Sequence, residues 1–252
     1  MKDGKKIYFA SDFHLGVPDY ERSLERERRI VAWLDRIKSD AEELYLLGDV
    51  FDFWFEYRKV VPRGYVRLLG KLAEIGDSGI PIHYFTGNHD MWTFDYLTKE
   101  LNVKLYRKPI EAEYGGKKFY IGHGDGLGPG DYGYKFIKKV FASPVSQWLF
   151  ARLHPNLGIG IAEYFSRKSR IATGITDEKF LGDEKEWLVI HSKELLEKNH
   201  YDYLVFGHRH LPLDIPINHQ SRYINLGDWI RYHSYGVFDG TNFHLRFDEG
   251  KS

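Results

Sequence analysis

Short apolar runs alternate with longer amphipathic stretches through the first half of the chain. Buried strands are predicted at 6–10, 44–47 and 80–86. Helices are predicted at 23–38 and 65–75, where apolar residues recur every three to four positions among charged ones. Each strand runs directly into a turn that contains Gly or Asp. This alternation is typical of βα units and predicts an α/β fold.

The second half of the chain changes character after a predicted hairpin. Strands at 110–114 and 117–121 flank two glycines, a pair typical of a tight turn. The segment from about 127 to 176 lacks strand alternation, and its apolar positions fall at helical spacing, interrupted by Pro144. We therefore expect a helical insertion there. The remaining predicted elements are a helix at 183–198, a strand at 203–206 and antiparallel strands at 223–226, 235–238 and 242–247.

Composition excludes several classes of protein. The 252 residues carry 36 basic and 36 acidic side chains, twelve histidines and no cysteine. Without cysteine there is no disulfide, zinc ribbon or thiol nucleophile, so a metal site must use His, Asp, Glu or Asn. Zero net charge also argues against a protein that mainly neutralises nucleic-acid phosphates. A catalytic or binding pocket is the better expectation.

The predicted insertion differs from the rest of the chain in charge. Residues 127–176 carry seven Lys or Arg against two acidic residues, a charge of +5, and the remainder of the chain carries −5. The same segment holds eight aromatic residues. Apolar helix faces with a basic margin could shelter acyl chains and receive phosphates or an anionic membrane surface. The alternative is that the aromatic residues bury the insertion on the body while the basic ones are solvated.

The amino terminus and the hydropathy of the chain bear on its location. The apolar run near the start is short and is followed by Asp12 and His14, which fits no signal peptide. No stretch approaches the roughly 18 apolar residues of a membrane span. We expect a cytoplasmic protein, with contact at a membrane surface left open.

Polar clusters of metal-ligand type follow five of the predicted strands. Loops beyond the carboxyl ends of strands in α/β folds converge on one crevice, so these side chains are expected to meet. Any single cluster is explained equally well by a turn or a surface pair, but five in succession favour a metal centre. The clusters are Asp12 and His14 in SDFHLG, Asp49 and Asp52 in GDVFD, Asn88, His89 and Asp90 in GNHD, His123 and Asp125 in GHGD, and His208 and His210 in GHRH.

The spacing and ligand types predict how such a centre is built. Alternation along an extended segment puts Asp12 and His14 on one side, and likewise His208 and His210, so each pair can chelate a single site. Carboxylates, imidazoles and an amide suit manganese, iron or zinc. A carboxylate flanked by two such sets can bridge ions roughly 3.5 to 4 Å apart, the separation used for displacement at phosphorus. Asp49 is the predicted bridge.

In this order of motifs, DxH, GDxxD, GNHD, GH and GHxH, the chain resembles the calcineurin-like metallophosphoesterase superfamily over roughly residues 6 to 238. The resemblance implies an α/β four-layer αββα sandwich, a single domain over 1–252 with a helical lid at about 127–176. It implies two divalent metal ions, Mn²⁺ first and Fe or Zn as alternatives, which activate a water that attacks phosphorus. One ion would be held by Asp12, His14, Asp49 and His210, and the other by Asp49, Asn88, His123 and His208.

The resemblance also implies roles for residues around the metals. His89 would act as the general acid or hold a phosphate oxygen, and Asp90 or Asp52 would orient nearby groups. The spare imidazole nitrogens of the ligands need acceptors, for which Asp52 and Asp125 are the candidates.

Three blocks, SDFHLG, GDVFDFW and NLGDWI, further resemble the UDP-2,3-diacylglucosamine diphosphatases of lipid A biosynthesis. Members of that family hydrolyse a pyrophosphate to UMP and 2,3-diacylglucosamine 1-phosphate, and they carry a lid between the GH and GHxH blocks. The resemblance implies a lipid-linked nucleotide substrate, a peripheral position on the inner membrane, and neither nucleic acid nor an obligatory protein partner. His89 stands where the better-known members carry Arg. The expected substrate contacts are Asn88, His89, Arg167, Lys168, Ser169 and Arg170.

Two other functions compete with this hypothesis. The first is a phosphodiesterase or phosphatase for soluble nucleotides, in which the insertion is a plain cap. The second is a metal-holding scaffold that binds partners without turnover. The apolar content of the insertion disfavours the first, and the complete ligand set together with His89 disfavours the second.

Overall fold

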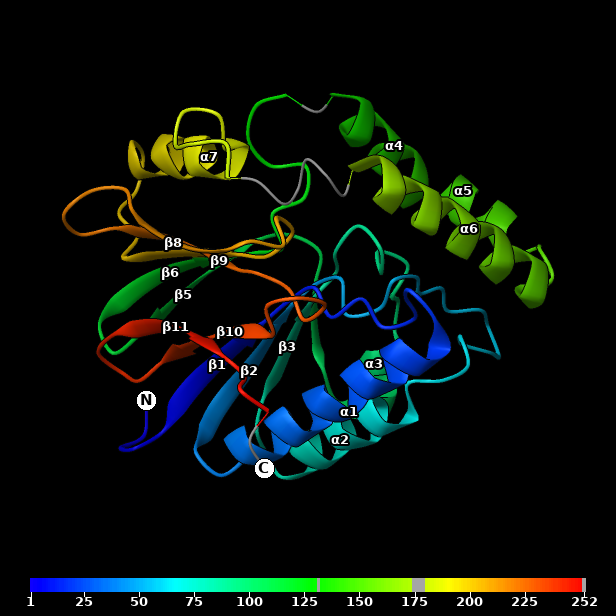
Figure 1. Cartoon of the computed structure of the whole chain (residues 1–252), viewed down its shortest axis with the longest axis horizontal. Helices are drawn as coiled ribbons and strands as arrows, with labels where there is room; N and C mark the ends of the chain where they lie inside the picture. The colour runs from blue at the N-terminus through cyan, green and yellow to red at the C-terminus, as the bar shows by residue number, and fades with distance from the viewer. Residues whose placement is uncertain (131, 174–179, 251–252) are drawn as a thin grey trace.

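Two β-sheets pack face to face in the structure, a computed structural model that describes residues 1–130, 132–173 and 180–250, with only the backbone described at 167–173 (Figure 1). The first sheet has the strand order β11-β10-β1-β2-β3-β4. Its strands are β1 (Lys6–Ala10), β2 (Ala41–Leu47), β3 (Ile82–Phe85) and β4 (Lys104–Tyr106), all parallel, and the antiparallel β10 (Ser234–Phe238) and β11 (Phe243–Phe247).

The second sheet has the strand order β5-β6-β7-β9-β8. Its strands are β5 (Ile110–Tyr114), β6 (Lys117–Ile121), β7 (Tyr203–Phe206), β8 (Pro212–Pro216) and β9 (Arg222–Leu226). β9 runs parallel to β7, so the expectation that it is antiparallel to its neighbours is correct only for its pairing with β8. The run of apolar residues predicted the strand but not its partner.

Helices cover the outer faces of both sheets (Figure 1). Helices α1 (Tyr20–Ile37) and α2 (Val66–Asp77) lie on the first sheet, and α7 (Trp187–Leu196) lies on the second. A short helix, α3 (Tyr96–Leu101), precedes β4. The predicted four-layer αββα sandwich is confirmed.

Three helices between β6 and α7 form a separate layer beyond the carboxyl ends of the strands (Figure 1). They are α4 (Tyr132–Ala142), α5 (Pro144–Phe150) and α6 (Pro155–Thr173), which we call the lid. Pro144 is the first residue of α5, where a missing backbone N–H is tolerated, and it therefore separates α4 from α5. Residues 174–176 of the predicted insertion lie outside the described part of the chain.

Helix α1 begins three residues earlier than the apolar pattern predicts. The carboxylate of Asp19 accepts a hydrogen bond from the backbone N–H of Arg22 at 2.9 Å and so caps the helix. The first turn is exposed and polar, and it therefore carries no apolar signal. α3 and β4 are too short for their patterns to predict them, and β8 begins and ends with Pro, a residue that argues against a strand.

The centre of the sandwich is an aromatic cluster between the two sheets. Strands β1 and β2 are buried on both faces, which explains why they are continuous apolar runs. Phe9 is fully buried there, with its ring centroid 5.0 Å from that of Tyr45 and 6.2 Å from that of Phe119. This cluster holds β1 and β2 in register, and both strands run into the loops of the candidate site.

We expect Phe9→Ala to lower the free energy of unfolding by about 3 to 5 kcal/mol, because the cavity cannot collapse between two fixed sheets. Urea unfolding followed by circular dichroism measures this loss. Phe247→Ala is the matched control, since that ring is 54% exposed at the end of β11. Equal losses in the two variants would contradict a packed inter-sheet core.

Candidate metal centre

Five ligand candidates have left-handed backbone conformations where the strands end. A positive φ is disfavoured for residues with a Cβ by about 1 kcal/mol or more, so the surrounding structure must hold it. This backbone is not extended, so the alternation assumed for these pairs is wrong. His208 and His210 belong to different groups of ligands, as the family resemblance implied, whereas Asp12 and His14 share one group. The five residues are Asp12 (φ 55°), His14 (45°), Asp49 (53°), His208 (70°) and His210 (54°).

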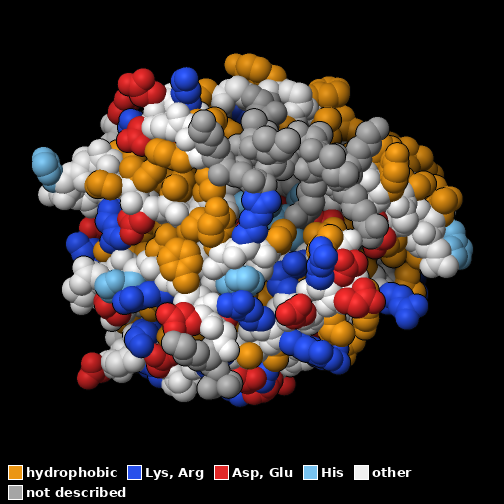
Figure 2. Space-filling model, viewed as in Figure 1, with side chains coloured by type: hydrophobic (Ala, Val, Ile, Leu, Met, Phe, Trp, Pro, Cys, Tyr) orange, Lys and Arg blue, Asp and Glu red, His pale blue; other side chains and the backbone are white. Residues whose placement is uncertain are grey.

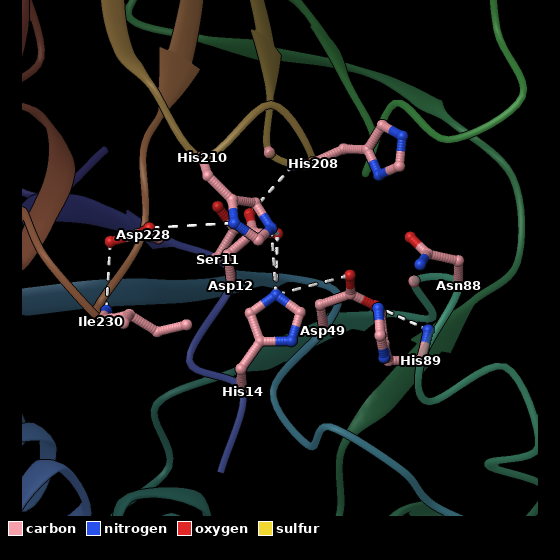
Figure 3. Close-up of polar contacts among 12 residues, drawn as sticks. Ser11, Asp12, His14, Asp49, Asn88, His89, His208, His210, Asp228 and Ile230 are labelled. Atoms are coloured by element: carbon pink, nitrogen blue, oxygen red, sulfur yellow. Dashed lines mark hydrogen bonds and ion pairs between the residues drawn. The ribbon is translucent and has the colours of Figure 1, made fainter. Parts of the chain in front are cut away.

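The first group of ligand atoms comes from the loops after β1, β2 and β7 (Figure 3). The Nε2 atom of His14 lies 3.1 Å from Nε2 of His210, 3.6 Å from Oδ1 of Asp12 and 3.7 Å from Oδ2 of Asp49. Asp12 Oδ1 also lies 3.2 Å from His210 Nε2. Four nitrogen and oxygen atoms thus converge on one point.

The second group shares Asp49 with the first and adds His123 and His208. Asp49 Oδ2 lies 3.4 Å from Nε2 of His123, and that nitrogen lies 3.3 Å from Oδ1 of Asn88. The rings of His123 and His208 have centroids 5.1 Å apart. The structure therefore brings together all seven predicted ligands, with Asp49 between the two sets.

The two groups fit divalent metal ions. Asp12 Oδ1 is buried and accepts no hydrogen bond from the described residues, which is an expensive state for a carboxylate oxygen unless it has a cation partner. The facing Nε2 atoms of His14 and His210 cannot both donate to each other. Imidazole and carboxylate ligands of this kind suit borderline and hard divalent ions.

An acceptor behind His123 fixes which ring nitrogen faces the centre, and carboxylates lie behind His14 and His210. Nδ1 of His123 lies 2.6 Å from the carbonyl oxygen of Leu47, Nδ1 of His14 lies 3.4 Å from Asp52 Oδ1, and Nδ1 of His210 lies 3.8 Å from Asp228 Oδ2. Figure 3 shows the contact between Asp228 and His210. In all three histidines Nε2 is directed at the ligand group, the usual arrangement in metal sites.

Asp125, the other candidate acceptor, forms contacts with the lid. Its carboxylate accepts from the Tyr134 hydroxyl at 2.5 Å and pairs with Lys138 at 2.6 Å, both on lid helix α4. Asp228 was not predicted at all, although it lies in the NLGDWI block. No local spacing relates it to His210, so only the fold reveals the contact.

Asp90 and His89 lie beside the ligand groups. Asp90 is fully buried and accepts hydrogen bonds from the backbone of Val50 at 3.0 Å and Gly87 at 2.7 Å, so it ties two ligand loops together. The backbone N–H of His89 donates to Asp49 Oδ1 at 2.9 Å, and its Nδ1 lies 2.9 Å from the carbonyl oxygen of Asp52. The His89 side chain is 17% exposed and thus open to a substrate.

Two motif glycines allow backbone to approach the carboxylates. A Cβ at Gly87 would lie 2.1 Å from Asp49 Oδ1, and one at Gly207 would lie 2.6 Å from Asp12 Oδ2. No side chain fits at these distances. The glycines of GNHD and GHRH are therefore required by the packing of the loops around Asp49 and Asp12.

A buried ion pair fixes the loop that carries His208 and His210. Between them, Arg209 donates through Nε and Nη2 to the two carboxylate oxygens of Glu186, each at 2.8 Å, and both side chains are almost completely buried. The guanidinium also lies 4.8 Å from the ring centroid of Trp187. Because Glu186 directly precedes α7, the pair connects the ligand loop to that helix.

Opposite charges shift the pKa values of Asp49 and His123. Burial alone would raise the pKa of Asp49, but the charges of His123 and His89 outweigh it and lower that pKa well below its usual range. Burial would likewise lower the pKa of His123, but the charge and hydrogen bond of Asp49 raise it to about 10. Burial and the His123 charge lower the pKa of His208 to about 4.

From these pKa values we expect metal binding near pH 7.5 to release about one proton from His123, since a ligand imidazole must be neutral. His123 is protonated below its raised pKa, so apparent metal affinity should rise with pH over this range. Titration calorimetry in buffers of different ionisation enthalpy measures the released proton. A binding enthalpy that does not depend on the buffer would contradict the expectation, and His123→Asn should lose the dependence.

The remaining predicted substrate contacts belong to the second half of α6. The side chains of Arg167, Lys168, Ser169 and Arg170 lie outside the described part of the structure, although their backbone continues α6.

No helix among the described residues is both long and apolar enough for a membrane crossing.

Comparisons with known proteins agree with this architecture. A UDP-2,3-diacylglucosamine hydrolase of Porphyromonas gingivalis is 43% identical over 95% of this chain and 96% of its own length. A protein of the same name from Histophilus somni is 27% identical over 89% of this chain and 92% of its own length. A structure of vacuolar protein sorting 29 from Cryptosporidium parvum has a TM-score of 0.50 at 13% identity, over 99% of this chain and 95% of that one, and shares the fold. The family described as calcineurin-like phosphoesterase matches residues 5–212. The chain therefore belongs to the calcineurin-like phosphoesterase family, a family of hydrolases that use divalent metal ions.

Proposed function

We propose that the protein hydrolyses the pyrophosphate bond of UDP-2,3-diacylglucosamine and releases UMP and 2,3-diacylglucosamine 1-phosphate. The observation that carries this proposal is the 43% identity, over nearly the full length of both chains, to a relative named UDP-2,3-diacylglucosamine hydrolase. The two ligand groups that share Asp49 support it, because a pair of metal sites with a common carboxylate suits displacement at phosphorus.

Two divalent ions, Mn²⁺ in our proposal with Fe or Zn as alternatives, would supply Lewis acidity and lower the pKa of water at this site. The chain would hold one ion through the group of Asp12, His14, Asp49 and His210, and the other through the group of Asp49, Asn88, His123 and His208. Asp90 would hold the loops after β2 and β3 together, because its carboxylate accepts hydrogen bonds from the backbone of Val50 and of Gly87.

His89 is the proposed proton donor to the leaving group, or the group that holds a phosphate oxygen. The carbonyl oxygen of Asp52 can only accept, so the 2.9 Å contact means that Nδ1 of His89 carries a hydrogen. Nε2 is then the ring nitrogen left to meet the substrate. A partly exposed imidazole beside the ligand groups supports this role.

The lid is the proposed contact with acyl chains and with the membrane surface. Hydrophobic side chains gather over the upper right of the molecule, where Figure 1 places the lid (Figure 2). Phe136, Val145 and Trp148 are 68%, 66% and 56% exposed. Lys135 and Lys139 on α4 and Arg152 in the turn between α5 and α6 add positive charge, as a surface that meets an anionic lipid requires. We therefore propose a peripheral position on the inner membrane.

We expect the double substitution Val145→Asp and Trp148→Ala to weaken binding to vesicles that contain phosphatidylglycerol by about 10-fold or more, since each large apolar side chain contributes about 1.5 to 3 kcal/mol when buried. Co-sedimentation measures the bound fraction. Phe247→Ala is the control, because that side chain is 54% exposed on β11, which lies far from the lid in Figure 1. Unchanged binding of the double variant would rule out the lid as the membrane contact.

One assay tests the proposed function. The Mn²⁺-loaded protein is incubated with UDP-2,3-diacylglucosamine and, separately, with a chromogenic phosphodiester, and UMP and chromophore are followed. UMP release is expected from the lipid. Turnover of the soluble ester without UMP from the lipid would overturn the proposed substrate and favour a phosphodiesterase for soluble esters. Inactivity on both, with metal bound, would indicate a scaffold.

A further inference from the structure

We infer that Ser166, on lid helix α6, is a positioning residue for His89, because its hydroxyl bridges the His89 imidazole and the Asp52 carboxylate. This inference rests on the proposed hydrolytic function. Ser166 Oγ lies 2.7 Å from Asp52 Oδ2 and 3.2 Å from Nδ1 of His89. The lid therefore reaches the residue that is proposed to meet the leaving group.

The hydrogen positions follow from the acceptors. Nδ1 of His89 carries a hydrogen, because it faces the carbonyl oxygen of Asp52, and it can share this hydrogen with Ser166 Oγ. The serine then donates its own hydrogen to Asp52 Oδ2. Asp52 Oδ1 lies 3.6 Å from Nδ1, which is too long for a hydrogen bond. The Ser166 hydroxyl thus connects the Asp52 carboxylate to the His89 imidazole through two hydrogen bonds, where Asp52 Oδ1 alone is too far from Nδ1 to form one.

The arrangement is not that of a serine nucleophile. In a nucleophilic triad the serine and the carboxylate occupy opposite nitrogens of the imidazole, so that one nitrogen takes the serine proton. Here Ser166 and Asp52 both lie on the Nδ1 side of His89, and the serine hydrogen is directed to Asp52. Ser166 can therefore orient His89 and polarise it, but it is not activated to attack.

The lid packs closely enough to hold Ser166 in place. A Cβ at Gly158 of α6 would lie 2.5 Å from the hydroxyl oxygen of Tyr57, so the helix backbone approaches the body directly. In α5, the Phe150 ring centroid lies 4.6 Å from that of Trp92 and 4.7 Å from that of Phe55. Beside Asp52, a cavity of about 270 Å³ is lined by residues of both α6 and the body. The position of α6 thus decides whether the serine reaches His89.

The test compares Ser166→Ala with the full-length wild type. We expect kcat for the chromogenic phosphodiester to fall by about 10-fold or more, with KM and bound metal unchanged, because a hydrogen bond to a charged group contributes that much. Ser166→Thr keeps the hydroxyl and should restore most of the rate. In a His89→Ala background, Ser166→Ala should have no further effect. The ¹⁵N resonance of His89 Nδ1, identified by its loss in His89→Ala, should shift in metal-free Ser166→Ala.

A matched control is Ser143→Ala, since Ser143 also lies in the lid but its side chain does not cap α5. An unshifted His89 resonance and wild-type kcat in Ser166→Ala would overturn the inference. So would a further loss of rate in the double variant, because the serine would then act on something other than His89. If the wild type releases no UMP from the lipid while these results hold, the proposed substrate fails and the role of Ser166 stands.

Discussion

Replacing Asp49 by alanine is expected to abolish hydrolysis, with turnover falling by at least about 10³-fold, which corresponds to about 4 kcal/mol of barrier. Asp49 Oδ2 belongs to both ligand groups, at 3.7 Å from His14 Nε2 and 3.4 Å from His123 Nε2. Its other oxygen accepts the backbone N–H of His89. One substitution therefore removes the common ligand and releases the proposed proton donor.

Turnover of the chromogenic phosphodiester and metal content by mass spectrometry together measure the effect of Asp49→Ala. Bound metal should fall from two ions per chain to one or none. Asp49→Asn keeps the shape of the side chain and separates the loss of charge from a loss of packing. Asp77→Ala, an exposed carboxylate at the end of α2, is the control. Two bound ions with turnover within tenfold of the wild type would mean that Asp49 is not the bridge.

The second large effect is expected at His89, where alanine should reduce turnover by roughly 10²- to 10⁴-fold, the usual contribution of general acid–base catalysis. Bound metal should stay unchanged, because His89 belongs to neither of the two groups that share Asp49, and the third cluster, in which it lies with His14 and Asp52, lacks that carboxylate. The exposed His219 is the matched control, and His219→Ala should leave turnover unchanged. Loss of metal in His89→Ala would falsify the role proposed for this residue.

The sequence was sufficient to predict which residues meet, but not how each is held. The clusters after β1, β2, β3, β6 and β7 were recognisable because each directly follows a short apolar run. The alternation assumed for His208 and His210 failed because it requires extended backbone, whereas both residues have a positive φ. Backbone conformation at these positions is imposed by neighbouring loops, so no local pattern encodes it.

Contacts between residues far apart in the sequence were also not predicted. Asp228 behind His210 and Ser166 behind His89 join segments that no spacing relates, and Asp228 lies in a block noticed only for its resemblance. The lid was predicted as a helical insertion from the helical spacing of its apolar residues, and its division into α4 and α5 follows from Pro144. That α4 would supply Tyr134 and Lys138 to Asp125 required the fold.

The place of the lid in the chain has a consequence for how this architecture can change over evolution. α4, α5 and α6 are inserted between β6 and α7, while α7 by itself returns the chain to β7 beside β6. A parallel crossover needs only one helix, so the lid can be lengthened, shortened or replaced without a change in the strand order of either sheet. Such an exchange would nevertheless be restricted by contacts between the lid and the body. A new lid would have to supply its own hydrogen-bond or ion-pair partners for Asp52 and Asp125. These two carboxylates therefore restrict which segments can replace the lid.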